Sequence, residues 1–204
     1  MHYIVYLTCI TLGRGMLHKV LRQNDAQLLL IQCIFRLPHC HMMLWLDEKD
    51  APKSAEDYDC FTCAEFPDKD DPEQAELHER VKTLMVHGPC VGINEDSPCY
   101  DKKTKECTKN FPKPFSRFSL HGESNYPIYR RRSPEDGGHT AEIYVNKKGK
   151  RQIDNRWVVP YNPVLMMKCN AHINVELVAS IAGIKYLFKY INKGTFLLTK
   201  KSYD

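Results

Sequence analysis

Apolar residues along the chain gather in short runs of the length that strands have. Residues 3–12 and 37–46 are two such runs, which predicts two strands, the second of them buried. Residues 170–177 alternate polar and apolar side chains, as a half-buried strand does. The apolar run at 28–35 cannot be assigned to helix or strand from its periodicity alone.

Two further segments have the period of an amphipathic helix. The first begins at Asp71, a favourable N-cap, and ends at Gly88 and Pro89, so that its last turn carries His87. The second spans residues 179–192. These two segments are the predicted helices.

Between the helices, the chain predicts three shorter strands and two connecting segments. The strands are residues 126–132, 140–145 and 154–163; the connections are an extended, proline-stiffened segment at 111–115 and a turn at 146–151. Arginine and lysine alternate with aromatic residues in this region, a composition that suits single-stranded nucleic acid.

Composition and charge indicate how the chain is organised into domains. At 204 residues the chain is long enough for one domain with an insertion. Residues 47–82 hold 13 acidic against 5 basic residues, whereas residues 101–204 hold 20 basic against 9 acidic residues. The polar composition after Leu46 predicts an insertion at about 47–125, and the basic half suggests a polyanionic partner, most simply nucleic acid. No segment reaches the length of a membrane span, and the start lacks the features of a signal peptide.

The chain has nine cysteines, an odd number with uneven spacing, which does not suit a secreted disulfide framework and favours a reducing compartment. One histidine and three cysteines with metal-ligand spacing follow the first predicted helix, in a loop that cannot build a hydrophobic core. They are His87, Cys90, Cys99 and Cys107. A structural Zn²⁺ could hold this loop together, although ordinary reduced cysteines are the alternative interpretation. Cys60 and Cys63 could supply a different pair of ligands.

Two histidines interrupt the apolar run at 37–46. His39 and His41 are two residues apart, so on a strand they project from the same face. Two imidazoles placed in this way can grip a divalent metal ion. The alternative is a pair of histidines on the solvated face of an edge strand.

Two tyrosines in the predicted helix at 179–192 have the spacing that brings their hydroxyls to one face. Tyr186 and Tyr190 lie four residues apart, and Lys185 and Lys189 form a neighbouring row. A tyrosine oxygen can attack phosphorus to form a covalent phosphotyrosine, and a neighbouring lysine would stabilise the charge that develops. The ordinary interpretation of such a helix is packing, with lysine stems shielding the rings.

Together with the paired histidines, these motifs resemble the Helitron transposase family, which are rolling-circle replication-initiator nucleases with a His-hydrophobic-His motif. This region of the family is also called a Helitron helicase-like domain. The resemblance is nearly continuous from residue 37 to residue 194. The segments that carry it are 37–46, His87-Gly88-Pro89-Cys90, Ser97-Pro98-Cys99, Cys107 with 111–115, 126–132, 154–163, 170–176 and 185–194.

The resemblance implies a metal-dependent nuclear enzyme that nicks and joins single-stranded DNA. His39 and His41 would hold Mg²⁺ or Mn²⁺, and Tyr186 and Tyr190 would be the nucleophiles that form a 5′-phosphotyrosine and release a 3′-hydroxyl. The implied fold is α+β, an antiparallel central sheet flanked by helices, with the histidines on a central strand and here a Cys/His-rich, partly helical insertion. The basic residues expected to bind DNA are Arg130, Arg131, Arg132, Arg156 and Lys193.

The chain also departs from the family pattern. Where the family carries a glutamate ahead of the histidine strand, this chain offers Gln32 as a neutral third metal ligand. Residues 1–36 match poorly, so we expect a nuclease domain at 37–194 that is incomplete on its N-terminal side, with a tail at 195–204. No Gly-x4-Gly-Lys-Ser/Thr loop occurs, so the helicase domain of full-length family members is expected to be absent. Two hypotheses result: a DNA strand transferase or a degenerate copy of one, and a zinc-stabilised nucleic-acid-binding module without catalysis.

Overall fold

The computed structural model describes residues 4–10, 27–33, 39–46, 49, 51–122, 127–145, 148–178 and 197–201. For residues 4–10, 27–33, 39–45, 178 and 197–201 the description is of the backbone. The chain divides into two compact units. Unit 1 comprises Met1–Cys63, Ser119–Tyr129 and Pro160–Asp204, and unit 2 comprises Ala64–Phe118 and Arg130–Val159.

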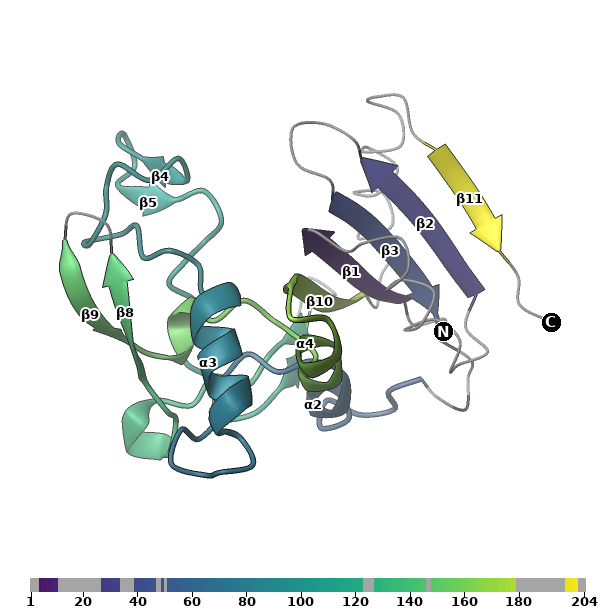
Figure 1. Cartoon of the computed structure of the whole chain (residues 1–204), viewed down its shortest axis with the longest axis horizontal. Coiled ribbons are helices and arrows are strands. Elements are labelled where there is room, and N and C mark those ends of the chain that lie inside the picture. Colours follow the sequence, from purple (N-terminus) through teal and green to yellow (C-terminus); the bar gives the residue numbers. More distant parts are fainter. Residues whose placement is uncertain are drawn as a thin grey trace. The chain divides into compact units, whose positions relative to one another are not determined.

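Unit 1 contains a five-stranded antiparallel sheet in the order β10-β1-β3-β2-β11 (Figure 1). Its strands are β1 (Ile4–Ile10), β2 (Gln27–Cys33), β3 (His39–Trp45), β10 (His172–Val178) and β11 (Leu197–Lys201). Strand β3 is the central one, since β1 pairs with one of its edges and β2 with the other. The strands predicted at 3–12, 37–46 and 170–177 are confirmed, and the undecided run at 28–35 is a strand.

Strand β10 shows the predicted half-buried pattern. Ile173, Val175 and Leu177 are buried, whereas the polar residues that alternate with them are partly exposed. One face of this strand therefore packs on the core of unit 1. The buried hydroxyl of Tyr129 fixes the strand further, because it accepts a hydrogen bond of 2.8 Å from the Leu177 backbone N–H.

The remaining described elements of unit 1 are short. They are α2 (Tyr58–Phe61), β6 (Leu120–His121), β7 (Pro127–Ile128) and α4 (Pro163–Cys169). Helix α4 was not predicted from the sequence, although two residues mark its start. The Asn162 side chain accepts a hydrogen bond from Leu165 N at 3.0 Å, and Pro163 occupies the first turn. Asn170 ends the helix in a left-handed conformation with φ of 44°.

Unit 2 is built from one longer helix, two hairpins and two turns of 3₁₀ helix. The elements are α3 (Ala75–Leu84), β4 (Tyr100–Asp101), β5 (Glu106–Cys107), η2 (Pro134–Asp136), β8 (Ala141–Val145), β9 (Gly149–Ile153) and η3 (Asn155–Trp157). Helix α3 buries Val81, and Met85 directly after it is also buried. Strand β8 confirms the strand predicted at 140–145.

The predicted bounds of α3 were wrong at both ends. Asp71 caps a turn rather than the helix, because its carboxylate accepts a hydrogen bond from Glu73 N and its carbonyl accepts from Gln74 N. The helix ends at Leu84, so His87 lies beyond it, in an extended segment next to the isolated bridge between Val86 and Val158.

Three other predictions of secondary structure were wrong in part. Of the strand predicted at 126–132, β7 accounts for two residues. The strand predicted at 154–163 begins as the 3₁₀ turn η3, because the Asp154 carboxylate accepts a hydrogen bond from Arg156 N at 3.0 Å and curls the chain locally. Residues 149–151, predicted as a turn, belong to β9.

The described part of the chain is a mixed α+β structure with antiparallel sheets, as predicted. The insertion at 47–125 stays a prediction. Among the described residues, no helix has both the length and the apolar character needed to cross a membrane.

Candidate metal centre

Four potential metal ligands of unit 2 come together from three local structures. His87 is held in the extended segment after α3, where its backbone N–H donates to Trp157 O at 2.9 Å. Cys90 begins a turn, and its carbonyl accepts from Asn94 N at 3.0 Å. Cys99 and Cys107 come from the β4–β5 hairpin: Cys107 in β5 pairs with Tyr100, and the carbonyl of Cys99, just before β4, accepts from Thr108 N at 2.8 Å.

The ligand atoms have the spacing of a single coordination shell. The Nε2 atom of His87 lies 3.7 Å from the sulfur of Cys90, 3.3 Å from that of Cys99 and 3.4 Å from that of Cys107. All four donor atoms lie within 4.8 Å of one another. A tetrahedron with metal–sulfur bonds of about 2.3 Å and metal–nitrogen bonds of about 2.0–2.1 Å has nitrogen–sulfur edges of about 3.6 Å. The four residues could therefore hold one metal ion, as the sequence predicted.

Aromatic rings fix the orientation of the histidine. The ring of Phe111 stacks on His87 at 4.3 Å between centroids with an interplanar angle of 10°. The ring of Trp157 is nearly parallel to His87 at 6.4 Å. Cys90 and Cys107 are buried, so solvent has little access to these two residues. The roles of both aromatic residues were not predicted, and the position of Phe111 four residues after Cys107 was the available signal.

Electrostatics around the centre favour a neutral imidazole and shift the pKa values of Cys90 and Cys107 in opposite directions. Burial, together with the charges of Lys113 and Lys109, lowers the pKa of His87. Burial and the neighbouring thiols raise the pKa of Cys90 to about 12. Burial opposes ionisation of Cys107, but hydrogen bonds from the backbone N–H groups of Phe111 and Lys109 lower its pKa overall. A cation among the sulfurs would stabilise the thiolate forms, because metal ligands bind deprotonated.

No protein-family model matches the chain, and no curated protein matches it either. The functional argument therefore rests on the residues themselves.

The histidines predicted to bind a catalytic metal are described at the level of the backbone. In the register of the central sheet, His39 pairs with Cys33 of β2 and His41 pairs with Ile31, whereas Gln32 pairs with Cys40. The ligand roles of His39, His41 and Gln32 stay predictions. The residues predicted for catalysis and one predicted for DNA binding lie outside the described residues: Lys185, Tyr186, Lys189, Tyr190 and Lys193.

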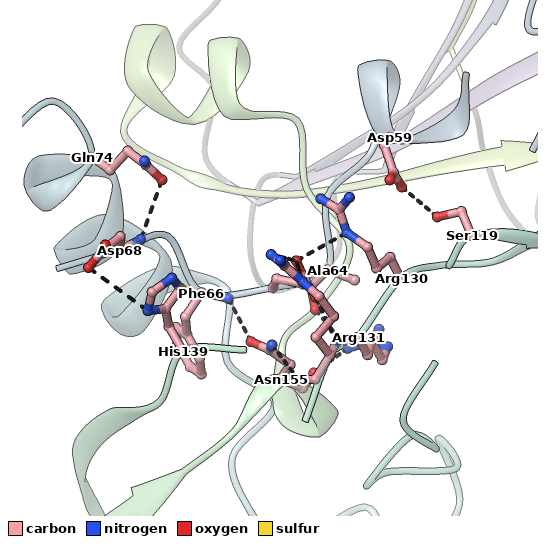
Figure 2. A network of polar contacts seen from close by, with 12 residues as sticks. Asp59, Ala64, Phe66, Asp68, Gln74, Ser119, Arg130, Arg131, His139 and Asn155 are labelled. Atoms are coloured by element: carbon pink, nitrogen blue, oxygen red, sulfur yellow. Dashed lines mark hydrogen bonds and ion pairs between the residues drawn. The ribbon is translucent and has the colours of Figure 1, made fainter. Parts of the chain in front are cut away.

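Arg131, predicted to bind DNA, is directed into unit 2. Its side chain is buried, and its Nη1 atom donates to the carbonyls of Asn155 at 2.6 Å and Ala64 at 3.3 Å (Figure 2). The same atom donates to the carbonyl of Val158 at 2.7 Å. The Asn155 side chain in turn accepts from Phe66 N at 2.8 Å. These contacts give Arg131 a structural role, and a buried guanidinium is not available to a phosphate.

The other three arginines predicted to bind DNA are partly exposed and each pairs with a carboxylate. Arg130 and Arg132 both contact Glu65, whose side chain is 5% exposed, at 3.2 and 2.7 Å. Arg156 pairs with Asp154 at 2.7 Å. Their charge is thus shared with internal partners, which weakens the case for a strongly basic surface at these positions.

Proposed function

We propose that His87, Cys90, Cys99 and Cys107 bind one Zn²⁺ ion with a structural role. Three sulfurs and one imidazole nitrogen form a donor set that suits zinc far better than hard cations such as Mg²⁺. Protein groups fill all four positions of the tetrahedron, which leaves none for water or substrate, so the ion would not act in catalysis.

Burial in the surrounding loop supports the structural role. Between residues 88 and 110, the buried residues are Pro89, Cys90 and Cys107. Two of these three are proposed ligands, so the loop has almost no apolar core to stabilise it. A bound metal ion supplies the missing stabilisation in small domains of this kind.

Metal analysis of the purified full chain tests this proposal. We expect one zinc per chain, and replacement by Co²⁺ should give the absorption bands of a tetrahedral thiolate site. Cys99→Ser should lose the metal, whereas Cys60→Ser, at an exposed cysteine of unit 1, should keep it. Zinc retained by Cys99→Ser, or lost equally by Cys60→Ser, would contradict the proposal.

For the whole chain, we propose a metal-dependent enzyme of the Helitron transposase type that nicks and joins single-stranded DNA. One observation carries this proposal: the strand with both histidines is the central strand of a five-stranded antiparallel sheet, which is the position that the resemblance predicts. Such an enzyme would act on transposon DNA in the nucleus.

The proposed chemistry transfers one DNA phosphate twice, first to a tyrosine and then to a 3′-hydroxyl. The hydroxyl oxygen of Tyr186 or Tyr190 attacks phosphorus, the bond from phosphorus to the 3′ oxygen breaks, and a proton ends on the released 3′-hydroxyl. The 3′-hydroxyl of another DNA strand then attacks the same phosphorus, the bond from phosphorus to the tyrosine oxygen breaks, and a proton returns to the tyrosine, so no external energy source is needed. Mg²⁺ or Mn²⁺ held at His39 and His41 would draw charge from the non-bridging oxygens of the phosphate.

A nicking assay on single-stranded DNA with Mn²⁺ tests the enzyme proposal. We expect protein–DNA adducts that resist denaturation and that disappear in the double variant Tyr186→Phe/Tyr190→Phe. The double variant His39→Ala/His41→Ala should also lose them.

The second candidate is a zinc-stabilised module that binds nucleic acid without catalysis. It is favoured by the metal cluster and by the six basic residues against one acidic residue at 102–118. DNA binding by the wild-type chain with no adduct under any metal condition would select this candidate over the enzyme.

A further inference from the structure

In unit 2, the segment that follows the metal cluster contacts other parts of the unit at several positions. We call this segment, residues 108–118, the strap. It begins after Cys107, and Phe111 stacks on His87. Lys113 N then donates to a backbone carbonyl of η3 at 3.0 Å. Ser116 exchanges two backbone hydrogen bonds with Arg131, of 3.0 and 2.8 Å. The strap is thus held at several points by the rest of unit 2.

The strap exposes aromatic rings that do not contribute to the core. Phe115 is 40% exposed and Phe118 is 69% exposed. The guanidinium of Arg156 lies over the ring of Phe115 at 4.6 Å. Pro112 and Pro114 restrict the backbone between the fastened points, so the rings are presented with little remaining freedom.

The strap and the β4–β5 hairpin before it are also basic. Residues 100–118 carry six basic residues and two acidic residues, Asp101 and Glu106. Arg117 pairs with Asp136 at 2.5 Å, whereas Lys103, Lys105 and Lys109 all lie on the surface. Exposed lysines therefore precede the two exposed rings within one short segment of the chain.

We propose that the strap binds single-stranded DNA, with bases stacked on Phe115 and Phe118 and phosphates attracted by the lysines. Unpaired bases offer π-faces to aromatic side chains, and a basic segment follows the phosphate backbone without reading sequence. Duplex DNA keeps its bases stacked on one another, so it fits this surface less well. The inference rests on the proposed function for the identity of the DNA, but it places recognition on residues that take no part in the chemistry.

Fluorescence anisotropy with labelled oligo(dT) and the zinc-loaded full chain tests this inference. Because stacking of one base accounts for about 1–3 kcal/mol, Phe115→Ala and Phe118→Ala should each weaken binding by at least about fivefold. Tyr144→Ala is the matched control, since this ring of β8 is 72% exposed in the same unit, and it should leave affinity unchanged. Phe118→Leu, which keeps apolar bulk without a ring, should behave like Phe118→Ala.

Several results would overturn the inference. The double variant Phe115→Ala/Phe118→Ala could bind as tightly as the wild type, or Tyr144→Ala could lose as much affinity as the strap variants. Tighter binding of duplex DNA or of oligo(U) than of oligo(dT) would also contradict the assignment to single-stranded DNA. Both rings are exposed, so these variants are expected to fold, and their zinc content verifies this.

The anisotropy measurements, combined with the nicking assay, also separate this inference from the proposed enzyme. Loss of binding in the strap variants, with no tyrosine adduct in the wild type, would support the strap and contradict the nuclease. Adducts that form equally well in wild type and strap variants, with equal affinities, would support the nuclease and contradict the strap.

Discussion

Replacing Arg131 with methionine should lower the stability of unit 2 rather than remove a DNA contact. The substitution removes two short hydrogen bonds, to the carbonyls of Asn155 and Val158, and one longer bond to Ala64. Hydrogen bonds from a charged donor contribute about 1.5–3 kcal/mol each, so the two short bonds account for about 3–6 kcal/mol. Domains of this size have a total stability of only about 5–15 kcal/mol. The stability lost with these two hydrogen bonds is therefore a large fraction of the total stability of the unit.

Thermal unfolding followed by circular dichroism measures this effect. Unit 2 has roughly 85 residues, and for a domain of that size a loss of about 3 kcal/mol lowers the unfolding midpoint by about 12–24 °C. Arg131→Lys should also be destabilised, because a single ammonium cannot reproduce the planar set of donors. Arg156→Met is the control, because Arg156 forms an ion pair near the surface with Asp154; the two side chains are 40% and 16% exposed, respectively. Such pairs contribute about 0–1 kcal/mol, so this variant should change the unfolding midpoint little.

The opposite result for Arg131 is equally informative. If Arg131→Met kept the wild-type unfolding midpoint but bound oligo(dT) more weakly, the guanidinium would be acting on DNA. The structural role assigned to Arg131 would then be wrong.

Three further predictions concern single side chains. Gly138→Ala should destabilise unit 2 by about 1–3 kcal/mol, because the added Cβ would overlap the carbonyl of Arg132; Gly88→Ala, whose Cβ meets nothing within 4 Å, is the control in urea denaturation. Burial opposes the charge of Glu65, but hydrogen bonds and charge from Arg132 lower its pKa below the ordinary 4.5. The charged Glu65 carboxylate therefore stabilises the folded state above pH 4.5, and this stabilisation is lost as the pH falls through the folded-state pKa. In Glu65→Gln, the unfolding midpoint should depend less on pH in this acid range. Tyr129→Phe should cost about 1–3 kcal/mol in thermal unfolding, because it leaves a buried backbone N–H of β10 without its acceptor; an unchanged midpoint would contradict this.

Strands were predictable from the sequence where burial imposes a period. From His172 to Leu177, strand β10 alternates between partly exposed polar residues and buried apolar residues, and the sequence shows this alternation. Helix α3 was predictable in existence but not in bounds, because the hydrogen bonds of Asp71 close a turn before the helix begins. Helix α4 has seven residues, too few for a period to stand out, and only its cap marks it.

The candidate metal centre was predictable in its ligands and not in its surroundings. Its cysteines and histidine lie in a loop with few apolar residues, Val91 and Ile93 among them, so their spacing in the sequence was enough to find all four. The stacking of Phe111 and Trp157 on His87 depends on contacts between distant segments, which spacing does not encode. The same limit explains Arg131: three consecutive arginines look alike in sequence, but only the fold decides which one is buried.

The division of the chain into units separates recognition from chemistry in the two proposals. Every residue of the metal cluster and of the strap belongs to unit 2, whereas all the residues proposed for catalysis fall within the ranges of unit 1. Cys107 would bind the ion and Phe111 stacks on a second ligand, so loss of the ion would loosen the start of the strap directly. The sheet of unit 1 shares none of these residues. A metal-free chain should therefore lose affinity for single-stranded DNA before its central sheet unfolds, because the proposed zinc ion would stabilise the unit proposed to bind the DNA rather than the unit proposed to cut it.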